Sequence, residues 1–177
     1  IIPCSDEEAL ILAKNRNLIE NLNTKIFVDD YNLLKKLSSK VKTYKLLKNF
    51  SKYVPQYYLC KNFKDVNLSI KKILEENNFF VIKPAEASRG GRNVCIIENT
   101  KKNYKKYFND NREIHASLSI FNNEIQKTYE KLFPLIIMEK LVLPAYDLDI
   151  LAREGKMLQC VSRHRVDPFG KNGHIVF

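Results

Sequence analysis

An apolar run that ends in a lysine, followed by a glycine-containing loop, constrains the fold of this chain most strongly. Residues 79–82 (Phe-Phe-Val-Ile) predict a buried strand that carries Lys83 at its end. Residues 85–93 are small or polar, and residues 94–97 predict the next strand. Because the chain returns as a strand and not as a helix, this segment differs from a Walker A loop and from a dinucleotide fingerprint.

The loop has residues that suit phosphate binding. Gly90 and Gly91 can adopt φ > 0 and allow close approach of the backbone, so that their N–H groups could point at phosphate oxygens. Lys83 would add a compact positive charge beside them. An ordinary hairpin with basic side chains is the alternative, and the segment alone does not decide between the two interpretations.

A second apolar strand, predicted over residues 135–138, stops at a carboxylate. Glu139 could accept a hydrogen bond from the exocyclic amine of a purine, while the backbone of Lys140 and Val142 offers a donor and an acceptor. Met138 would supply a polarizable apolar wall. The alternative is a carboxylate exposed to solvent at the end of a strand.

Residues 146–151 alternate strictly between polar and apolar side chains, which predicts a strand with two distinct faces. Asp147 and Asp149 share one face, as a ribose or a cationic acceptor would need. A solvent-facing strand edge is the alternative. Residues 154–155 predict a turn, and residues 157–161 predict the strand that follows it.

Elsewhere the pattern predicts further helices and strands. Ser5 can cap a helix, with Glu8 three residues later as a capping box requires. Further helices are expected over 31–37, 66–76, 103–111 and 120–132 and from Lys40 to before Pro55, with strands over 25–28 and 56–60. Residues 1–3 resemble the end of a strand, so we expect a lobe upstream of this chain. Residues 175–177 form an apolar triplet that no following element closes, so we also expect a continuation downstream.

The charge of the chain is compatible with several partners. Among 177 residues, 30 Lys and Arg outweigh 20 Asp and Glu, giving a net charge of +10. Such a surplus suits nucleic acid, an anionic membrane or a phosphorylated substrate. Lysine-rich helix faces that arise from coding bias are the alternative, and we favour it, since Lys greatly outnumbers Arg and Asn is abundant. The sequence has no helix-turn-helix, zinc-finger or RNP-type pattern that would indicate a nucleic-acid-binding module.

The sequence does not support a membrane protein, a zinc protein or a hydrolase with a catalytic triad. The longest apolar run is far shorter than the roughly 20 residues of a membrane span, and no signal peptide opens the chain, so a soluble, cytoplasmic protein is expected. The four cysteines form no C-x-x-C pair, which favours reduced thiols over a zinc site. The three histidines form no triad pattern with a serine or cysteine.

Taken in order, these features resemble the ATP-grasp superfamily, and within it the carbamoyl-phosphate-synthase-like and amino-acid-ligating members. The resemblance covers nearly the whole chain and is carried by Lys40, Ile82-Lys83-Pro84, Gly90-Gly91, Met138-Glu139-Lys140, the strand of Asp147 and Asp149, and Arg163-x-Arg165. One departure is Ser39, which stands where relatives commonly have an aspartate before the first lysine.

The resemblance implies an α+β fold, α/β at its N-terminus, with two ATP-grasp lobes and a small lid subdomain, truncated at both ends. Residues 1–39 would be the end of a preceding α/β lobe. Residues 40–137 would be the N-terminal part of the grasp, including the glycine-loop lid. Residues 138–177 would begin its C-terminal lobe.

The resemblance also implies roles for individual residues. Lys40 and Lys83 would bind phosphates, under a lid formed by Ser88, Arg89, Gly90 and Gly91. Adenine would be read by Glu139, Lys140 and Val142, and Asp147 would face the ribose. Arg163 and Arg165 would act in catalysis, holding the transferring phosphate or an acceptor carboxylate bidentately.

The implied reaction is an ATP-dependent ligation that forms a carbon–nitrogen bond. A small carboxylate is activated as an acyl phosphate, which an amine attacks, with Mg²⁺ bridging the phosphates of ATP. The family's magnesium ligands would lie beyond Phe177, so we expect this chain alone to turn nothing over. The alternative is a catalytically inactive nucleotide-binding module, or one that binds nucleic acid or another anionic partner. The sequence leaves a homodimer open.

Overall fold

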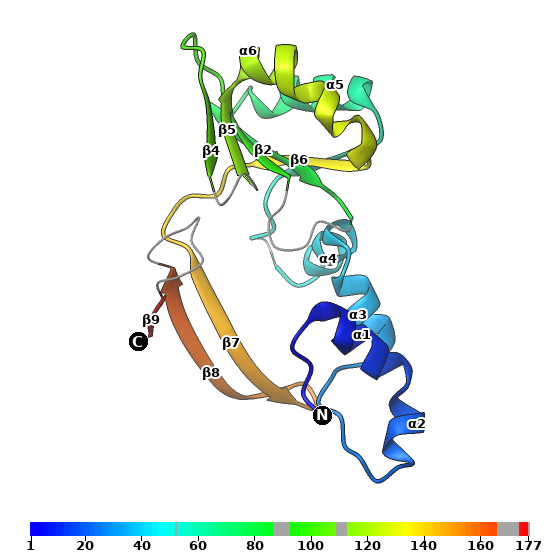
Figure 1. Cartoon of the computed structure of the whole chain (residues 1–177). Coiled ribbons are helices and arrows are strands. Elements are labelled where there is room, and N and C mark those ends of the chain that lie inside the picture. Colours follow the sequence, from blue (N-terminus) through cyan, green and yellow to red (C-terminus); the bar gives the residue numbers. More distant parts are fainter. Residues whose placement is uncertain (52, 87–92, 109–112, 166–173, 177) are drawn as a thin grey trace.

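The structure is a computed structural model that describes residues 1–51, 53–86, 93–108, 113–165 and 174–176, and it is a mixed α+β fold (Figure 1). Its larger sheet has six strands in the order β1 (Tyr57–Cys60), β6 (Leu135–Glu139), β2 (Phe79–Pro84), β3 (Val94–Glu98), β5 (Glu113–Ser117) and β4 (Lys105–Phe108). A separate antiparallel sheet contains β7 (Tyr146–Arg153), β8 (Lys156–Arg165) and β9 (His174–Val176).

One face of the six-stranded sheet is covered by helices (Figure 1). The covering elements are α5 (Phe63–Ile73), the short α6 (Leu118–Ile120), the π-helical η2 (Phe121–Ile125) and the 3₁₀-helical η3 (Gln126–Leu132). Asn62 caps α5 by accepting a hydrogen bond from the backbone N–H of Asp65, and apolar residues at helical spacing are buried beneath it. The main core therefore lies between this face and these helices, with Phe80, Ile82 and Phe121 fully buried.

The opposite face of this sheet is called the open face below. Helix α4 (Lys40–Leu47) packs against it at β1 and β6, where Val41 and Tyr44 contact a smaller cluster that includes Ile136 and Met138. Ser39 caps this helix by accepting a hydrogen bond from the backbone N–H of Lys42 at 3.4 Å. The start of α4 is thus fixed close to the sheet.

Three helices precede α4: α1 (Asp6–Lys14), α2 (Arg16–Glu20) and α3 (Tyr31–Leu37). The predicted helix start at Ser5 is confirmed, since the hydroxyl of Ser5 accepts from the N–H of Glu8 at 3.2 Å. The carboxylate of Glu8 accepts in turn from the N–H of Cys4. None of the described helices is long and apolar enough to cross a membrane.

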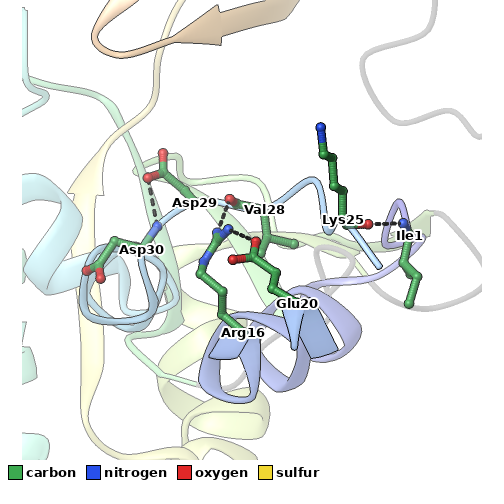
Figure 2. Close-up of polar contacts among 7 residues, drawn as sticks. All are labelled: Ile1, Arg16, Glu20, Lys25, Val28, Asp29 and Asp30. Atoms are coloured by element: carbon green, nitrogen blue, oxygen red, sulfur yellow. Dashed lines mark hydrogen bonds and ion pairs between the residues drawn. The ribbon is translucent and has the colours of Figure 1, made fainter. Parts of the chain in front are cut away.

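The strand predicted over residues 25–28 is not part of a sheet among the described residues. The chain there is held by two backbone hydrogen bonds, from the N-terminus of Ile1 to Lys25 and from Phe27 to Ile1. Arg16 adds a third contact, donating to the carbonyl of Val28 at 2.6 Å while it pairs with Glu20 (Figure 2). The hydrogen bonds resemble one step of a parallel ladder, but a strand needs successive steps.

The helix predicted over residues 103–111 is wrong for residues 103–108, and residues 109–111 lie outside the described part of the chain. Residues 105–108 form β4, which pairs antiparallel with β5, an element that the sequence pattern did not reveal. Ser117 donates its N–H to the carbonyl of Tyr104, and β5 also pairs in parallel with β3. Cross-strand pairing therefore overrides the local helical preference of this lysine-rich segment.

We expect Phe80→Ala to lower the free energy of unfolding by about 3–5 kcal/mol, because it leaves a cavity in the main core. Leu68 lies on the exposed side of α5, and Leu68→Ala should change stability by no more than about 0.5 kcal/mol. Urea denaturation of both variants measures the difference. Equal losses would contradict the described core.

Candidate functional site

Side chains on the open face form rows that cross the six-stranded sheet from strand to strand. One row consists of Tyr57, Met138, Val81, Ile96, His115 and Lys106, which are direct partners on successive strands. Within β2, the open face carries Phe79, Val81 and Lys83 at the two-residue spacing of a strand, while Phe80 and Ile82 enter the main core. Along β2, the side chains on the open face are thus aromatic, then aliphatic, then cationic.

The predicted phosphate ligands Lys40 and Lys83 come together at the cationic end of β2. Lys83 donates from Nζ to the hydroxyl of Tyr44 at 3.0 Å, and Tyr44 lies one helical turn from Lys40 on α4. Burial lowers the pKa of Lys40, and the neighbouring charge of Lys83 lowers it further. Two cations that repel each other in a half-buried place would gain from a bound anion.

The position of Lys40 within α4 strengthens this argument. Lys40 is the first residue of the helix, where the helix dipole disfavours a positive charge and favours an anion. The charges of Lys83 and of the helix terminus therefore act in the same direction. The start of α4 and the end of β2 together define a candidate anion site.

Glu86 also belongs to this site, and the sequence analysis missed it. The hydroxyl of Ser39 donates to Oε1 of Glu86 at 2.7 Å, and the charge of Glu86 partly restores the pKa of Lys40. A carboxylate thus lies close to Lys40 even though the residue before it is a serine. The contact joins residues 47 positions apart, so no local pattern could have revealed it.

Some predicted residues lie outside the description of the structure. They are Ser88, Arg89, Gly90 and Gly91, together with the side chain of Arg165, the last residue of β8. The flanks of the loop are held to the sheet layer. Ala85 is buried and donates its N–H to the carbonyl of Pro134, and Asn93, at φ 58°, accepts a hydrogen bond from the hydroxyl of Tyr129.

The structure gives Glu139 a different surrounding from the one predicted. Glu139 is the register partner of Phe80, which enters the main core, whereas Lys83 lies on the open face. Oε1 of Glu139 accepts from the N–H of Gln56 at 2.7 Å, where the strand pair β1–β6 ends. The predicted hydrogen bond from a purine amine to Glu139 therefore lacks support in this geometry, because the carboxylate already accepts a hydrogen bond from the backbone of Gln56.

The segment after Glu139 borders a hollow of about 500 Å³. Its lining includes Phe79 on one side and Lys140, Val142 and their neighbours on the other. The ammonium of Lys140 lies 4.9 Å from the centre of the Phe79 ring, and Val142 is 90% exposed. Phe79 was not among the predicted site residues, although strand alternation places it on the same face as Lys83.

The remaining predicted residues lie in the separate sheet. Asp147 and Asp149 occupy one face of β7, as predicted, with Asp147 opposite Arg163 of β8. Arg163 donates a hydrogen bond from Nη2 to Oδ1 of Asp149 at 2.9 Å, and its Nε lies 2.9 Å from Oδ2 as an ion pair without hydrogen-bond geometry. The guanidinium of Arg163 is therefore engaged, and it would have to leave Asp149 to hold a phosphate bidentately.

Metal and thiol chemistry gain no support from the described residues. Within that part of the chain, no three His, Cys, Asp or Glu side chains gather into a group that could hold a metal ion. The four cysteines are free thiols, and burial raises the pKa of Cys95 to about 12. Cys95 is therefore protonated at neutral pH and acts as a core residue.

Sequence comparisons find no protein-family model and no curated protein that matches this chain. A functional assignment must therefore come from the residues and their arrangement.

The lowered pKa of Lys40 leads to a prediction about pH. Lys40 binds its proton less tightly in the folded protein than in the unfolded chain, so stability should rise with pH between the lowered value and about 10.5. Lys40→Met removes this titration. The unfolding free energy of the natural protein should therefore increase relative to that of the variant as the pH rises through this window. A constant difference between the two proteins would contradict the half-buried position of Lys40.

Proposed function

We propose that this chain is the ATP-binding portion of an ATP-dependent carboxylate–amine ligase of the ATP-grasp type. The observation that carries the proposal is the convergence of Lys40 and Lys83 at one end of the open face of β2. Like charges brought together by two different elements favour a polyanionic ligand. A surface on which lysines merely solvate helices would not favour one.

The dimensions of β2 support a nucleoside triphosphate. Four residue steps separate Phe79 from Lys83, which at roughly 3.3 Å per residue spans about 13 Å. A base that rests on Phe79, beside the backbone of Lys140 and Val142, would leave its phosphates near the two lysines. Val81, between them, is half-buried and apolar and would lie under the sugar or the edge of the base.

The chain would contribute charge neutralisation and positioning to the reaction. Lys40 and Lys83 would offset the negative charge of the phosphates as the terminal phosphoryl group moves from ATP to the substrate carboxylate. An amine would then attack the carbonyl carbon of the acyl phosphate, losing a proton and releasing inorganic phosphate. Magnesium would supply further neutralisation of the phosphate charge, but the described residues offer no ligand set for it, and we assign it to none of them.

Two alternatives share the same site. A nucleotide-binding module without turnover would use the same lysines, and a nucleic-acid-binding module would use the net charge of +10. The first alternative differs from the proposed ligase because it has no catalytic activity, and the second differs because its ligand is a nucleic acid. We favour the nucleotide because the strand that brings Lys83 to Lys40 carries the aromatic ring of Phe79 at its other end, about 13 Å away and beside Lys140.

We expect Lys83→Ala to weaken ATP binding by about tenfold or more, since it removes a charge-assisted contact worth about 1.5–3 kcal/mol. Lys64, exposed on α5, provides the matched control, and Lys64→Ala should leave the affinity unchanged. Isothermal titration calorimetry at fixed ionic strength measures both. Equal affinity for the natural protein and Lys83→Ala would contradict the proposal.

The same proteins separate the nucleic-acid alternative. Titration with single-stranded RNA and duplex DNA at increasing salt should give weak binding that Lys83→Ala and Lys64→Ala reduce alike. Tight, steeply salt-dependent binding to either polymer, with no ATP binding, would favour the alternative.

A further inference from the structure

A histidine on the open face is held in place by two neighbours. Nε2 of His115 lies 2.6 Å from Oε1 of Glu113, and the ring of Phe108 lies 4.4 Å from the imidazole, centre to centre. Only 18% of the His115 side chain and 13% of the Glu113 side chain are exposed. These three residues form what we call the β4–β5 cluster, and none of them belongs to the site described above.

The sheet register places the β4–β5 cluster beside the nucleotide path proposed above. His115 is the direct partner of Ile96, and Ile96 is the direct partner of Val81, so all three belong to one row on the open face. Neighbouring strands lie about 4.8 Å apart, so His115 is one strand away from Ile96 and two strands away from Val81. Glu113 is the partner of Val94, which is also on the open face.

On the open face, β2 and β3 therefore lie between helix α4 on one side and the β4–β5 cluster on the other. Helix α4 packs at β1 and β6 and carries Lys40, while the β4–β5 cluster stands on β5 and β4. His115 shares the row of Val81, between Phe79 and Lys83 along the strand direction. It is thus closer to the expected sugar and base than a ligand of the terminal phosphate would be.

We infer that His115, oriented by Glu113, contacts the nucleoside part of the bound nucleotide and helps to determine specificity for it. The inference rests on the proposed function. An imidazole offers both a flat ring for stacking on a base and nitrogen atoms for hydrogen bonds. Glu113 fixes the ring orientation through the short contact with Nε2, as partners of functional histidines commonly do.

The test compares ATP with inorganic tripolyphosphate, which has the phosphates without the nucleoside. His115→Ala should weaken ATP binding by about tenfold, the loss of one ring contact, and leave tripolyphosphate affinity unchanged. Lys83→Ala should weaken both ligands. Tyr107→Ala is the matched control on the same hairpin, because Tyr107 is half-exposed and pairs with Ile114 on the other face.

Each outcome of this test either supports or overturns the inference about His115. A selective loss of ATP affinity supports the inference, and so does partial retention in His115→Gln, which keeps a polar group near Glu113 and serves if His115→Ala does not fold. An unchanged ATP affinity, or an equal loss for both ligands, overturns the inference while the lysine site stands. Failure of the natural protein to bind either ligand overturns the proposed function and, with it, the inference.

Discussion

The antiparallel pairing of β2 with β6 determines which side chains of this protein can meet a ligand. Ile82 is paired with Ile137 and Lys83 with Ile136, so Phe80 and Ile82 enter the main core and Lys83 stays on the open face. A slip by one residue would exchange the two faces and bury the charge of Lys83 among the helices. The burial of Phe80 and Ile82 therefore also fixes the position of the candidate site.

The six-stranded sheet and the candidate anion site are linked through α4. Val41 and Tyr44 pack on Ile136 and Met138, and this contact fixes Lys40 close to Lys83. The free energy gained by burying these apolar side chains offsets the cost of burying Lys40 and of placing it near Lys83, a cost that the charge of Glu86 reduces. The packing of α4 on the sheet therefore positions the candidate anion site.

Sequence reasoning succeeded where a single element carries the signal. Strong periodicity identified the helix that contains Val66 and Ile70 and the strand that delivers Lys83, and the capping pair at Ser5 marked a helix start. It failed where strand pairing determines the secondary structure, since residues 105–108 form a strand by pairing with β5. The candidate site follows the same division. The Lys40–Lys83 pair was expected, whereas the turning of Glu139 toward Gln56 and the approach of Glu86 depend on the sheet register and on contacts distant in sequence.

The net charge of the described residues at the candidate anion site is smaller than a triphosphate would need. Among the described residues there, Lys40 and Lys83 are opposed by Glu86, so one net positive charge faces the ligand. A triphosphate carries more negative charge than that. The sequence of residues 87–92 includes two arginines, and the ligase proposal also invokes a divalent cation. Under the ligase proposal, Lys40 and Lys83 would be part of a larger set of charges, and affinity for the full triphosphate would depend on further cationic groups.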